Sequence, residues 1–426
     1  MSFKEWKEVE IQDISDVVFS GGTPSTKKSE YWDGSYNWLS SGETRNRFIT
    51  DTEKKITKDG IENSSTKLAK IDDIVIASAG QGNTRGQTSI CKIDTYINQS
   101  LIAIRANKEI VNPYYLFYNI SSRYDELRKI SDGHSIRGSL TTKIINSFKV
   151  KLPSIEEQKA IANILSDLDN KIEVNNKINK NLEDMAQAIF KHWFVDFEFP
   201  NDEGKPYKSS RGEMVDSELG MIPKGWEVVK YGDVIEKIVD NRGKTPKTET
   251  SGYRLVEGFN INMGDSFIGN ISEKQKYVNE ETYNTWFRSG HPQHLDILCA
   301  TVGTLPKWCF ANKSEDICIA QNIIAIRSKK EICSQYYLKL YMDTREFIGA
   351  FNGRIVTTAQ PSIKVGHMEG IKIILPPIHM IKKLDNLVES IYRRIENNSD
   401  ENQRLSNLRD TLLPKLMSGE IRVPIE

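Results

Sequence analysis

The chain has 426 residues, more than one hydrophobic core usually organises, so we expect about two to three domains. Hydrophobic residues make up 38% and charged residues 27% of the chain, which excludes an intrinsically disordered protein, and no apolar run reaches the roughly 18 residues of a membrane helix. Basic and acidic residues number 58 each, so no overall positive charge would attract nucleic acid, and such binding would have to come from local patches. The N-terminal segment lacks the apolar stretch of a secretion signal, and we therefore expect a cytoplasmic protein.

The chain repeats itself at an offset of about 220 residues. Trp6 corresponds to Trp226, and the Gly-Thr-Pro that contains Thr23 corresponds to the Lys-Thr-Pro that contains Thr245. Further along, residues 70–80, 97–105 and 150–155 correspond in the same order to residues 291–303, 319–327 and 373–378. This colinear similarity predicts two related halves.

Each half begins with a mixed α/β pattern. Short β-branched runs, such as residues 73–77 and 101–105, alternate with turns of Gly, Asn and Ser, and one helical stretch is expected near residues 113–130. Each half then changes at a proline into one long helix, over residues 155–193 and 380–416, with Pro414 as the only late helix breaker. Between the halves, residues 197–225 are rich in turn-forming and charged residues, which is typical of a linker.

The two long helices carry the same seam. Alternating steps of four and three residues select positions that are apolar at both ends and polar in the middle. The stripe runs for about four heptads, or roughly 50 Å at 1.5 Å per residue, so each helix needs a partner to cover it. The seam positions are Ile161, Leu165, Leu168, Ile172, Asn175, Asn179, Leu182, Ala186, Ile189 and Trp193 in the first helix, and Leu384, Val388, Ile391, Ile395, Asn398, Asn402, Leu405, Arg409, Leu412 and Leu416 in the second.

The polar centre of the seam predicts how the helices pair. If they are antiparallel and centred, Asn175 lies opposite Asn402, and Asn179 lies opposite Asn398. Each amide then satisfies another, whereas a shifted register would bury them against Leu or Ile at about 1–3 kcal/mol per unsatisfied amide. The alternative is that these asparagines are simply exposed on the helix surface. We favour the seam because the same pair occurs in both repeats.

Short matches to enzyme motifs fail on spacing or context. The sequence Asn-Pro-Tyr-Tyr from Asn112 lacks the second proline of the Asn-Pro-Pro-Tyr motif of amino-methyltransferases, and Asn112 is better explained as a helix N-cap. Residues 243–245 resemble the end of a P-loop, but Ile238 stands where the earlier glycine belongs, and Pro246 follows.

The candidate metal and nuclease motifs are weak as well. His291 and His294 have no cysteines at a zinc-binding spacing, and Glu157 with Lys159 is better explained as a solvated helix face than as the end of a nuclease signature. The five cysteines include no Cys-x-x-Cys pair, and we expect them to be reduced structural thiols. We therefore expect no catalytic residues, metal site or bound cofactor in this chain.

Two sets of polar loops contain the types of side chain that commonly contact nucleic acids. In residues 79–89, glycines allow a close approach of the backbone, while Gln, Asn and Arg side chains can reach base edges or phosphates. Any one such residue is more often ordinary loop surface, but two similar domains with different loops are what two different half-sites require. The candidate DNA-binding residues are Thr23, Lys27, Lys28, Arg45, Gln81, Asn83, Arg85 and Arg137 in the first repeat, and Arg242, Lys244, Thr245, Lys247, Thr304, Lys307 and Arg354 in the second.

The most specific stretches are LPSIEEQKAIANILSDLDNKIEVNNKINKNLEDMAQAIFKHWFVDFEFP, GKPYKSSRGEMVDSELGMIPKGWEV and, on the second helix, LRDTLLPKLMSGEIRV. With these stretches the whole chain resembles the specificity subunit of type I restriction-modification systems. The resemblance implies an α+β fold with two repeated mixed α/β target recognition domains, separated by two long helices that form an antiparallel coiled coil in a pseudo-twofold arrangement. Each target recognition domain would read one half of a split, asymmetric DNA site.

The resemblance also implies partners and domain boundaries. Two methyltransferase subunits would dock on the helices and motor-nuclease subunits would join them, so S-adenosylmethionine, ATP and Mg²⁺ would be used by these partners. The expected domains are the two target recognition domains at residues 1–152 and 223–376, the helices at 153–195 and 377–426, the latter with a C-terminal tail, and the linker at 196–222. The alternative is a free-standing two-domain regulator that binds DNA or RNA without a methyltransferase.

Overall fold

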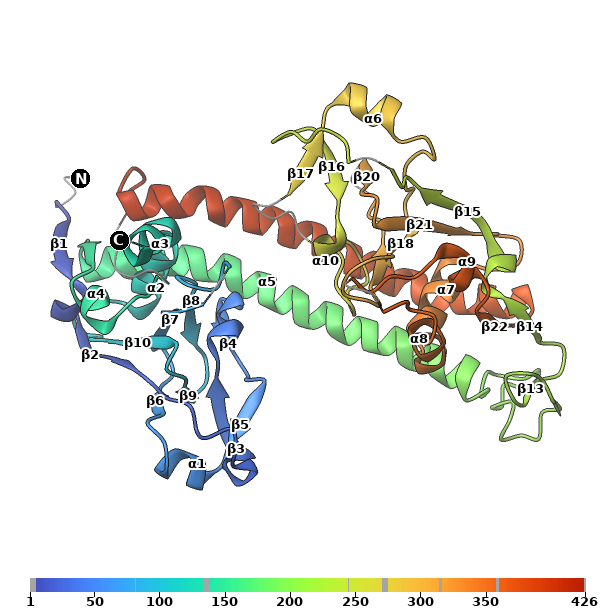
Figure 1. Cartoon of the computed structure of the whole chain (residues 1–426), viewed down its shortest axis with the longest axis horizontal. Coiled ribbons are helices and arrows are strands. Elements are labelled where there is room, and N and C mark those ends of the chain that lie inside the picture. Colours follow the sequence, from blue (N-terminus) through green and yellow to red (C-terminus); the bar gives the residue numbers. More distant parts are fainter. Residues whose placement is uncertain are drawn as a thin grey trace. The chain divides into compact units, whose positions relative to one another are not determined.

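The computed structural model describes residues 5–80, 82–132, 138–243, 245–269, 275–313, 316–357 and 360–424. It divides into two compact units, Met1–Lys171 with Leu405–Glu426, and Ile172–Arg404. Each unit combines one mixed α/β part with a segment of each of the long helices α5 (Ile155–Phe190) and α10 (Ile378–Ser418), whose labels can be followed in Figure 1. The division between the units falls inside the long helices.

The α/β part of the first unit contains two mixed sheets and a two-stranded ribbon. The sheets have the strand orders β2-β10-β7-β8-β4 and β5-β3-β9-β6, and β1 pairs with β11. The elements are β1 (Lys7–Glu10), β2 (Ser15–Ser20), β3 (Trp32–Leu39), β4 (Phe48–Ile49), β5 (Lys54–Ile56), α1 (Lys58–Glu62), β6 (Lys67–Ala69), β7 (Ile74–Ala77), β8 (Thr88–Cys91), β9 (Thr95–Ile97), β10 (Leu101–Ala106), α2 (Pro113–Ser121), α3 (Tyr124–Asp132), α4 (Thr142–Asn146) and β11 (Lys149–Leu152).

The second unit repeats this topology. Its sheets have the orders β15-β21-β18-β19 and β17-β16-β20, β14 pairs with β22, and a further short ribbon joins β12 to β13. The elements are β12 (Met214–Val215), β13 (Ile222–Pro223), β14 (Glu227–Lys230), β15 (Ile235–Asp240), β16 (Tyr253–Val256), β17 (Lys276–Val278), α6 (Glu280–Trp286), β18 (Ile297–Ala300), β19 (Trp308–Phe310), β20 (Ile317–Ile319), β21 (Ile323–Ser328), α7 (Gln335–Met342), α8 (Arg345–Asn352), α9 (Val365–Glu369) and β22 (Lys372–Leu375). The sequence repeat is therefore a repeat of structure.

The central strands are buried on both faces, which explains their uninterrupted apolar sequence. In β7, Ile74 and Ile76 belong to a cluster that reaches α2 and the long helices, whereas Val75 and Ala77 belong to a cluster shared with the second sheet. In the second unit, β18 alternates between two clusters in the same way. Each large aliphatic side chain buried here contributes about 1.5–3 kcal/mol.

One helical prediction is wrong in detail. The single helix expected near residues 113–130 is two helices, α2 and α3. The break follows two serines, Ser121 and Ser122, whose hydroxyls donate to the carbonyls of Tyr118 (3.2 Å) and Asn119 (2.8 Å). Serine side chains compete for backbone groups in this way, so they favour helix ends over helix interiors.

The two long helices extend slightly beyond their predicted ends. After Phe190, α5 widens into a π-helical turn (Lys191–Val195), and α10 continues through Pro414 to Ser418. Pro414 removes only one backbone hydrogen bond near the end of the helix. Gly419, with a φ of +78°, then ends α10, because the left-handed conformation at this position favours glycine.

Asparagine side chains join α5 to α10 within the second unit. Asn175 Nδ2 donates to Asn402 Oδ1 at 2.9 Å, and Asn398 Nδ2 donates to Asn179 Oδ1 at 2.8 Å, which are the two pairs that the centred register predicts. Asn402 Nδ2 also donates to Asn176 Oδ1 at 2.8 Å. Since rising positions in α5 pair with falling positions in α10, the helix segments are antiparallel.

The segment predicted as a linker belongs to the core of the second unit. Phe197 and Phe199 are buried, and the ring of Phe199 stacks on that of Trp226 with centroids 5.2 Å apart. Ile222 is buried in the same cluster. These few apolar side chains lie among turn-forming and charged residues, so the sequence pattern indicated a linker and not a part of the core.

Replacing both Asn175 and Asn402 by leucine should raise the thermal stability of the full chain and permit other helix registers. Removing both buried polar partners eliminates their desolvation cost, whereas Asn402→Leu alone leaves amides unsatisfied and should lower the free energy of unfolding by about 1–3 kcal/mol. Thermal and urea unfolding measure both effects. Asn170→Leu, at an exposed position of α5, is the control that should change little. A double variant less stable than the wild type, with an unchanged register, would contradict the prediction.

Candidate nucleic-acid interface

Two candidate loops of the first unit meet at the turn between β9 and β10. The backbone N–H of Gly22 donates to the carbonyl of Ile97 at 3.0 Å, and Thr23 Oγ1 donates to Gln99 Oε1. On the other side, the N–H of Ser78, which begins the glycine loop after β7, donates to the carbonyl of Ser100 at 2.8 Å. The structure therefore brings the Gly-Thr-Pro loop and the glycine loop to one edge of the unit.

The Gly-Thr-Pro loop is held by tryptophans, and its cations are exposed. Trp38 Nε1 donates to the carbonyl of Gly22 at 3.3 Å, and Trp32 Nε1 donates to the carbonyl of Ser25 at 3.2 Å. Lys27 and Lys28 lie on the exposed part that follows. A hydrogen bond of 2.9 Å to the Tyr31 hydroxyl raises the pKa of Lys28, so this side chain remains cationic.

The glycine loop is tied to α3. Arg128 Nη1 donates to the carbonyl of Gly82 at 2.8 Å, and the Tyr124 hydroxyl donates to the carbonyl of Asn83 at 2.9 Å. Asn83 itself is exposed, whereas Arg85 is only 6% exposed and forms an ion pair with Asp132. The Arg85 side chain thus packs the loop against α3 and presents little surface to a ligand.

The remaining candidates of the first unit differ in their surroundings. Arg45 is exposed, donates to the carbonyl of Gly42 at 3.0 Å and pairs with Glu53. Arg47, at the end of the same segment, instead pairs with the buried Asp169 of α5 at 3.2 Å. Gln81 and Arg137 lie outside the described residues.

In the second unit, the loop after β18 lies beside the segment before α9. The N–H of Gly303 donates to the carbonyl of Pro361 at 2.9 Å, and the N–H of Ile363 donates to the carbonyl of Thr301 at 2.9 Å. Thr304 is exposed on this loop, and Lys307 is half-buried. Arg354 Nη1 donates to the carbonyl of Ala350 at 2.8 Å, near the end of α8.

The loop after β15 carries the other candidates of the second unit. Arg242 Nε donates to both carboxylate oxygens of Asp240, at 3.0 and 2.8 Å, so its guanidinium is held in place. Thr245 and Lys247 are exposed, and Lys247 Nζ lies 3.6 Å from a Glu249 carboxylate oxygen. Lys244 lies outside the described residues.

Sequence reasoning missed two exposed residues beside this loop, Trp286 at the end of α6 and Arg288 just after it. Aromatic stacking anchors α6, because Tyr283 lies between Tyr253 and His291, with ring centroids 4.0 and 3.7 Å away. The only signal in the sequence was a Trp-Phe-Arg run after a short polar segment. That run has no characteristic spacing and predicts nothing by itself.

Other motifs have structural roles. Asn112 Oδ1 accepts from the N–H groups of Tyr114 (2.9 Å) and Tyr115 (3.1 Å), which confirms the N-cap interpretation. The prediction that Glu157 lies on a solvated helix face is wrong. Glu157 is 2% exposed and pairs with Arg422 at 2.6 and 2.8 Å, because the C-terminal segment folds back onto α5 within this unit.

His294 and the five cysteines pack within the fold. His294 Nε2 lies 3.1 Å from Glu396 Oε1, and within the described parts of the chain no group of three metal-ligating side chains occurs. All five cysteines are buried, and burial raises the pKa of the Cys299 and Cys318 thiols to about 12. Among the described residues, no helix is both long and apolar enough to span a membrane.

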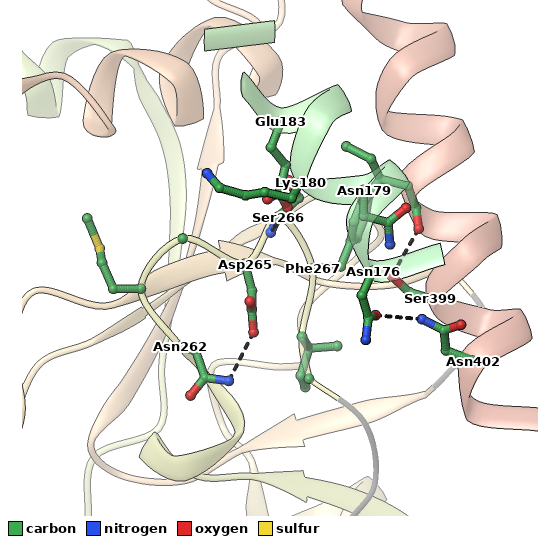
Figure 2. Close-up of a pocket in the computed structure, with 15 residues that line it drawn as sticks. Asn176, Asn179, Lys180, Glu183, Asn262, Asp265, Ser266, Phe267, Ser399 and Asn402 are labelled. Atoms are coloured by element: carbon green, nitrogen blue, oxygen red, sulfur yellow. Dashed lines mark hydrogen bonds between the residues drawn. The ribbon is translucent and has the colours of Figure 1, made fainter. Parts of the chain in front are cut away.

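A polar cavity of about 560 Å³ lies in the second unit beside the asparagine layer of α5 and α10, as Figure 2 shows. Glu183 Oε1 accepts from the N–H of Ser266 at 2.9 Å, and Asn262 Nδ2 donates to Asp265 Oδ2 at 2.9 Å. Desolvation raises the pKa of the Glu183 and Asp265 carboxyls. Glu183 thus ties α5 to the loop of residues 262–269, and the bond between Asn262 and Asp265 braces that loop internally.

Two related α/β units with unlike loops, each built onto paired helix segments, define a two-domain recognition protein. Residues 3–184 and 223–406 match the model of the family described as type I restriction modification DNA specificity domain. The chain belongs to this family, and the resemblance seen in its sequence is confirmed. It is a specificity protein with two target recognition domains.

Relatives and a solved structure agree with this family. The chain is 29% identical to the MjaIX specificity subunit of Methanocaldococcus jannaschii, over 99% of this chain and 94% of that protein. It is 24% identical to the HindI specificity subunit of Haemophilus influenzae, over 98% of this chain and 100% of that protein. The crystal structure of a type I S subunit from M. genitalium shares the fold, with a TM-score of 0.54 at 16% identity, over 98% of this chain and 96% of that one.

His291 should make the second unit less stable as the pH falls. Burial lowers its pKa, its Nδ1 is buried without a hydrogen-bond partner, and Nε2–H donates to the carbonyl of Tyr283 at 3.0 Å. In the unfolded chain, histidine takes up a proton near pH 6.5, whereas folded His291 resists it until a lower pH. The free energy of unfolding should therefore fall as the pH drops through about 6.5 and level off below the folded pKa.

Urea unfolding of the full chain between about pH 7.5 and pH 5 measures this dependence. His291→Asn should weaken it, and His192→Asn, at an exposed position on the turn after α5, should leave it as in the wild type. Equal pH dependence in the wild type and His291→Asn would refute this origin.

Proposed function

We propose that this specificity protein is the DNA-recognition subunit of a type I restriction-modification complex and reads a split, asymmetric site with one half-site per domain. The observation that carries the proposal is one framework with two different loop sets. Arg105 pairs with Asp73 and Arg327 pairs with Asp296 at equivalent positions, at 2.7 and 2.6 Å. Around these shared pairs the loop side chains differ, as two unlike half-sites require.

Catalysis in such a complex would belong to the partner subunits. We assign S-adenosylmethionine to two methyltransferase subunits, and ATP and Mg²⁺ to motor-nuclease subunits. The zero net charge of the chain supports a DNA grip that is shared with these partners, since phosphate contacts supply much of the affinity in protein–DNA complexes. The isolated chain should therefore bind DNA weakly.

Methylome sequencing of the source strain with and without this gene tests the role directly. Loss of one split, asymmetric methylated motif on deletion is the expected outcome, and the motif would give both half-sites. If methylation does not change, a band-shift with the chain alone becomes decisive. Tight binding without a methyltransferase would favour the alternative, a free-standing two-domain regulator.

The helix pair offers a surface for the methyltransferase subunits. We place the seam at heptad positions a and d, with Leu165 at position a. Apolar side chains at position e are then buried, as at Phe190 and Tyr392, or half-buried, as at Ile155 and Ile378 in the first turns of the helices. Position g lies on the other flank of the seam and carries exposed apolar side chains. These are Ile164 (38% exposed) and Leu408 (48%) in the first unit, and Met185 (54%) and Leu387 (43%) in the second.

The two apolar pairs are equivalent under the sequence repeat. Leu387 follows Ile164 by 223 residues, Leu408 follows Met185 by 223, and the seam residues Leu384 and Ile161 are separated by the same 223. Scattered exposed apolar residues are common, but the same pair in both units is not expected from chance. Two equivalent surfaces suit two copies of one partner, which supports a methyltransferase on each.

Replacing Ile164 and Leu408 by glutamate should release one methyltransferase copy, and Met185→Glu with Leu387→Glu should release the other. Native mass spectrometry of the purified complex counts the copies. Val174→Glu is the matched control, because Val174 is 51% exposed on α5 but corresponds to the polar Asn397 in the repeat. If both double variants retain both copies, this surface is not the docking site of the methyltransferase subunits.

A further inference from the structure

A cavity of about 530 Å³ in the second unit lies between the loop after β15 and the end of α6. One wall is formed by Asp240, Asn241 and Arg242, and the other by Trp286, Arg288 and Ser289. These segments are more than 40 residues apart in the sequence, so the cavity exists only in the folded unit.

Asn241 fastens the two walls together. Its Nδ2 donates to the carbonyl of Gly290 at 3.0 Å, and its Oδ1 accepts from the N–H of Ser289 at 3.0 Å. The Ser289 hydroxyl donates to the carbonyl of Asp240 at 2.7 Å. Three hydrogen bonds between the two segments therefore fix the distance between the walls.

The side chains around the opening suit DNA. Trp286 is 44% exposed, Arg288 is exposed, and Asp240 holds the guanidinium of Arg242. Arginine is the commonest specific reader of guanine through its O6 and N7 acceptors, and an apolar surface discriminates the thymine methyl group. An exposed Trp alone would mean little, but here it lines the same cavity as two arginines, and one of them, Arg242, stands on a loop already selected as a DNA candidate.

In the described residues of the first unit, the segment equivalent to α6 forms no such surface. Its helix α1 has five residues, whereas α6 has seven. The segment that follows α1, residues 63–65, reads Asn-Ser-Ser and contributes neither an aromatic ring nor a cation. A feature present in one repeat only is suited to reading one half-site only.

We propose that Arg288 reads a base pair of the second half-site and that Trp286 forms the apolar wall against which that base pair packs. Arg242, fixed by Asp240, supports the same contact from the opposite wall. The proposal rests on the proposed function, because it assigns a base-reading site to the second target recognition domain.

The test substitutes Arg288→Ala and Trp286→Ala separately in the chromosome of the source strain and sequences the methylome. Each should relax the motif at one position of the second half-site, by about one to two orders of magnitude in preference for the original base, and leave the first half-site unchanged. Arg345→Ala, an exposed arginine at the start of α8, is the control and should keep the whole motif.

Two outcomes would overturn the proposal. An unchanged motif at full methylation would show that the cavity does not contact DNA. An unchanged motif with uniformly weaker methylation, and binding whose log–log salt slope falls by about one, would make Arg288 a phosphate contact. Failure of the proposed function would look different, since the unaltered strain would then have no split methylated motif.

Discussion

The pairing of α5 with α10 is the constraint on which both units depend, because neither long helix can bury its seam alone. In the first unit this constraint centres on Asp169, which accepts from the Tyr118 hydroxyl (2.8 Å), from Arg47 Nε (3.2 Å) and from Arg409 Nη1 (2.6 Å). One carboxylate thus joins the α/β part to both helices. A buried charge left without such partners would cost several kcal/mol, so the helix segments and the sheet have one compatible arrangement. In the second unit, Glu396 joins α10 to the α/β part, accepting from the N–H of Lys313 at 2.7 Å.

Periodic features were predictable from the sequence, and contacts between distant loops were not. The alternation of strands β7 and β18, the helix seam and the Asn112 cap follow from local patterns that physical chemistry reads directly. The contacts that Arg85 and Arg354 make do not follow from local patterns. Arg85 pairs with Asp132, 47 positions away, and no spacing rule encodes that meeting. An arginine in a glycine-rich loop has the same sequence appearance whether it faces a phosphate or a carboxylate.

The loops of the two units are supported by different means, although their frameworks agree. In the first unit, the glycine loop is fastened by side chains of α3, through Arg128 and Tyr124. Both loops accept a backbone N–H at their start, from Leu140 at Ser78 and from Ile363 at Thr301, and in the second unit the loop also pairs with the backbone around Ser362. Backbone pairing tolerates a change of side chain better than a specific arginine clamp does. Divergence of the loop sequence therefore has fewer structural consequences in the second unit, and the framework pairs Asp73–Arg105 and Asp296–Arg327 are what remains common.

The segments that cover the first tryptophan of each repeat also differ between the two units. The first tryptophan of each repeat is covered, but by different chemistry. Over Trp6 lies the guanidinium of Arg422, 5.4 Å from the ring centroid and paired with Glu157, whereas Trp226 is covered by phenylalanines such as Phe199. Aromatic burial needs only apolar area, but a buried carboxylate needs its cation to remain in place. The C-terminal segment of this chain is therefore a structural part of the first unit, since losing Arg422 would leave Glu157 as a buried charge beside the sheet and helix that carry the first set of loops.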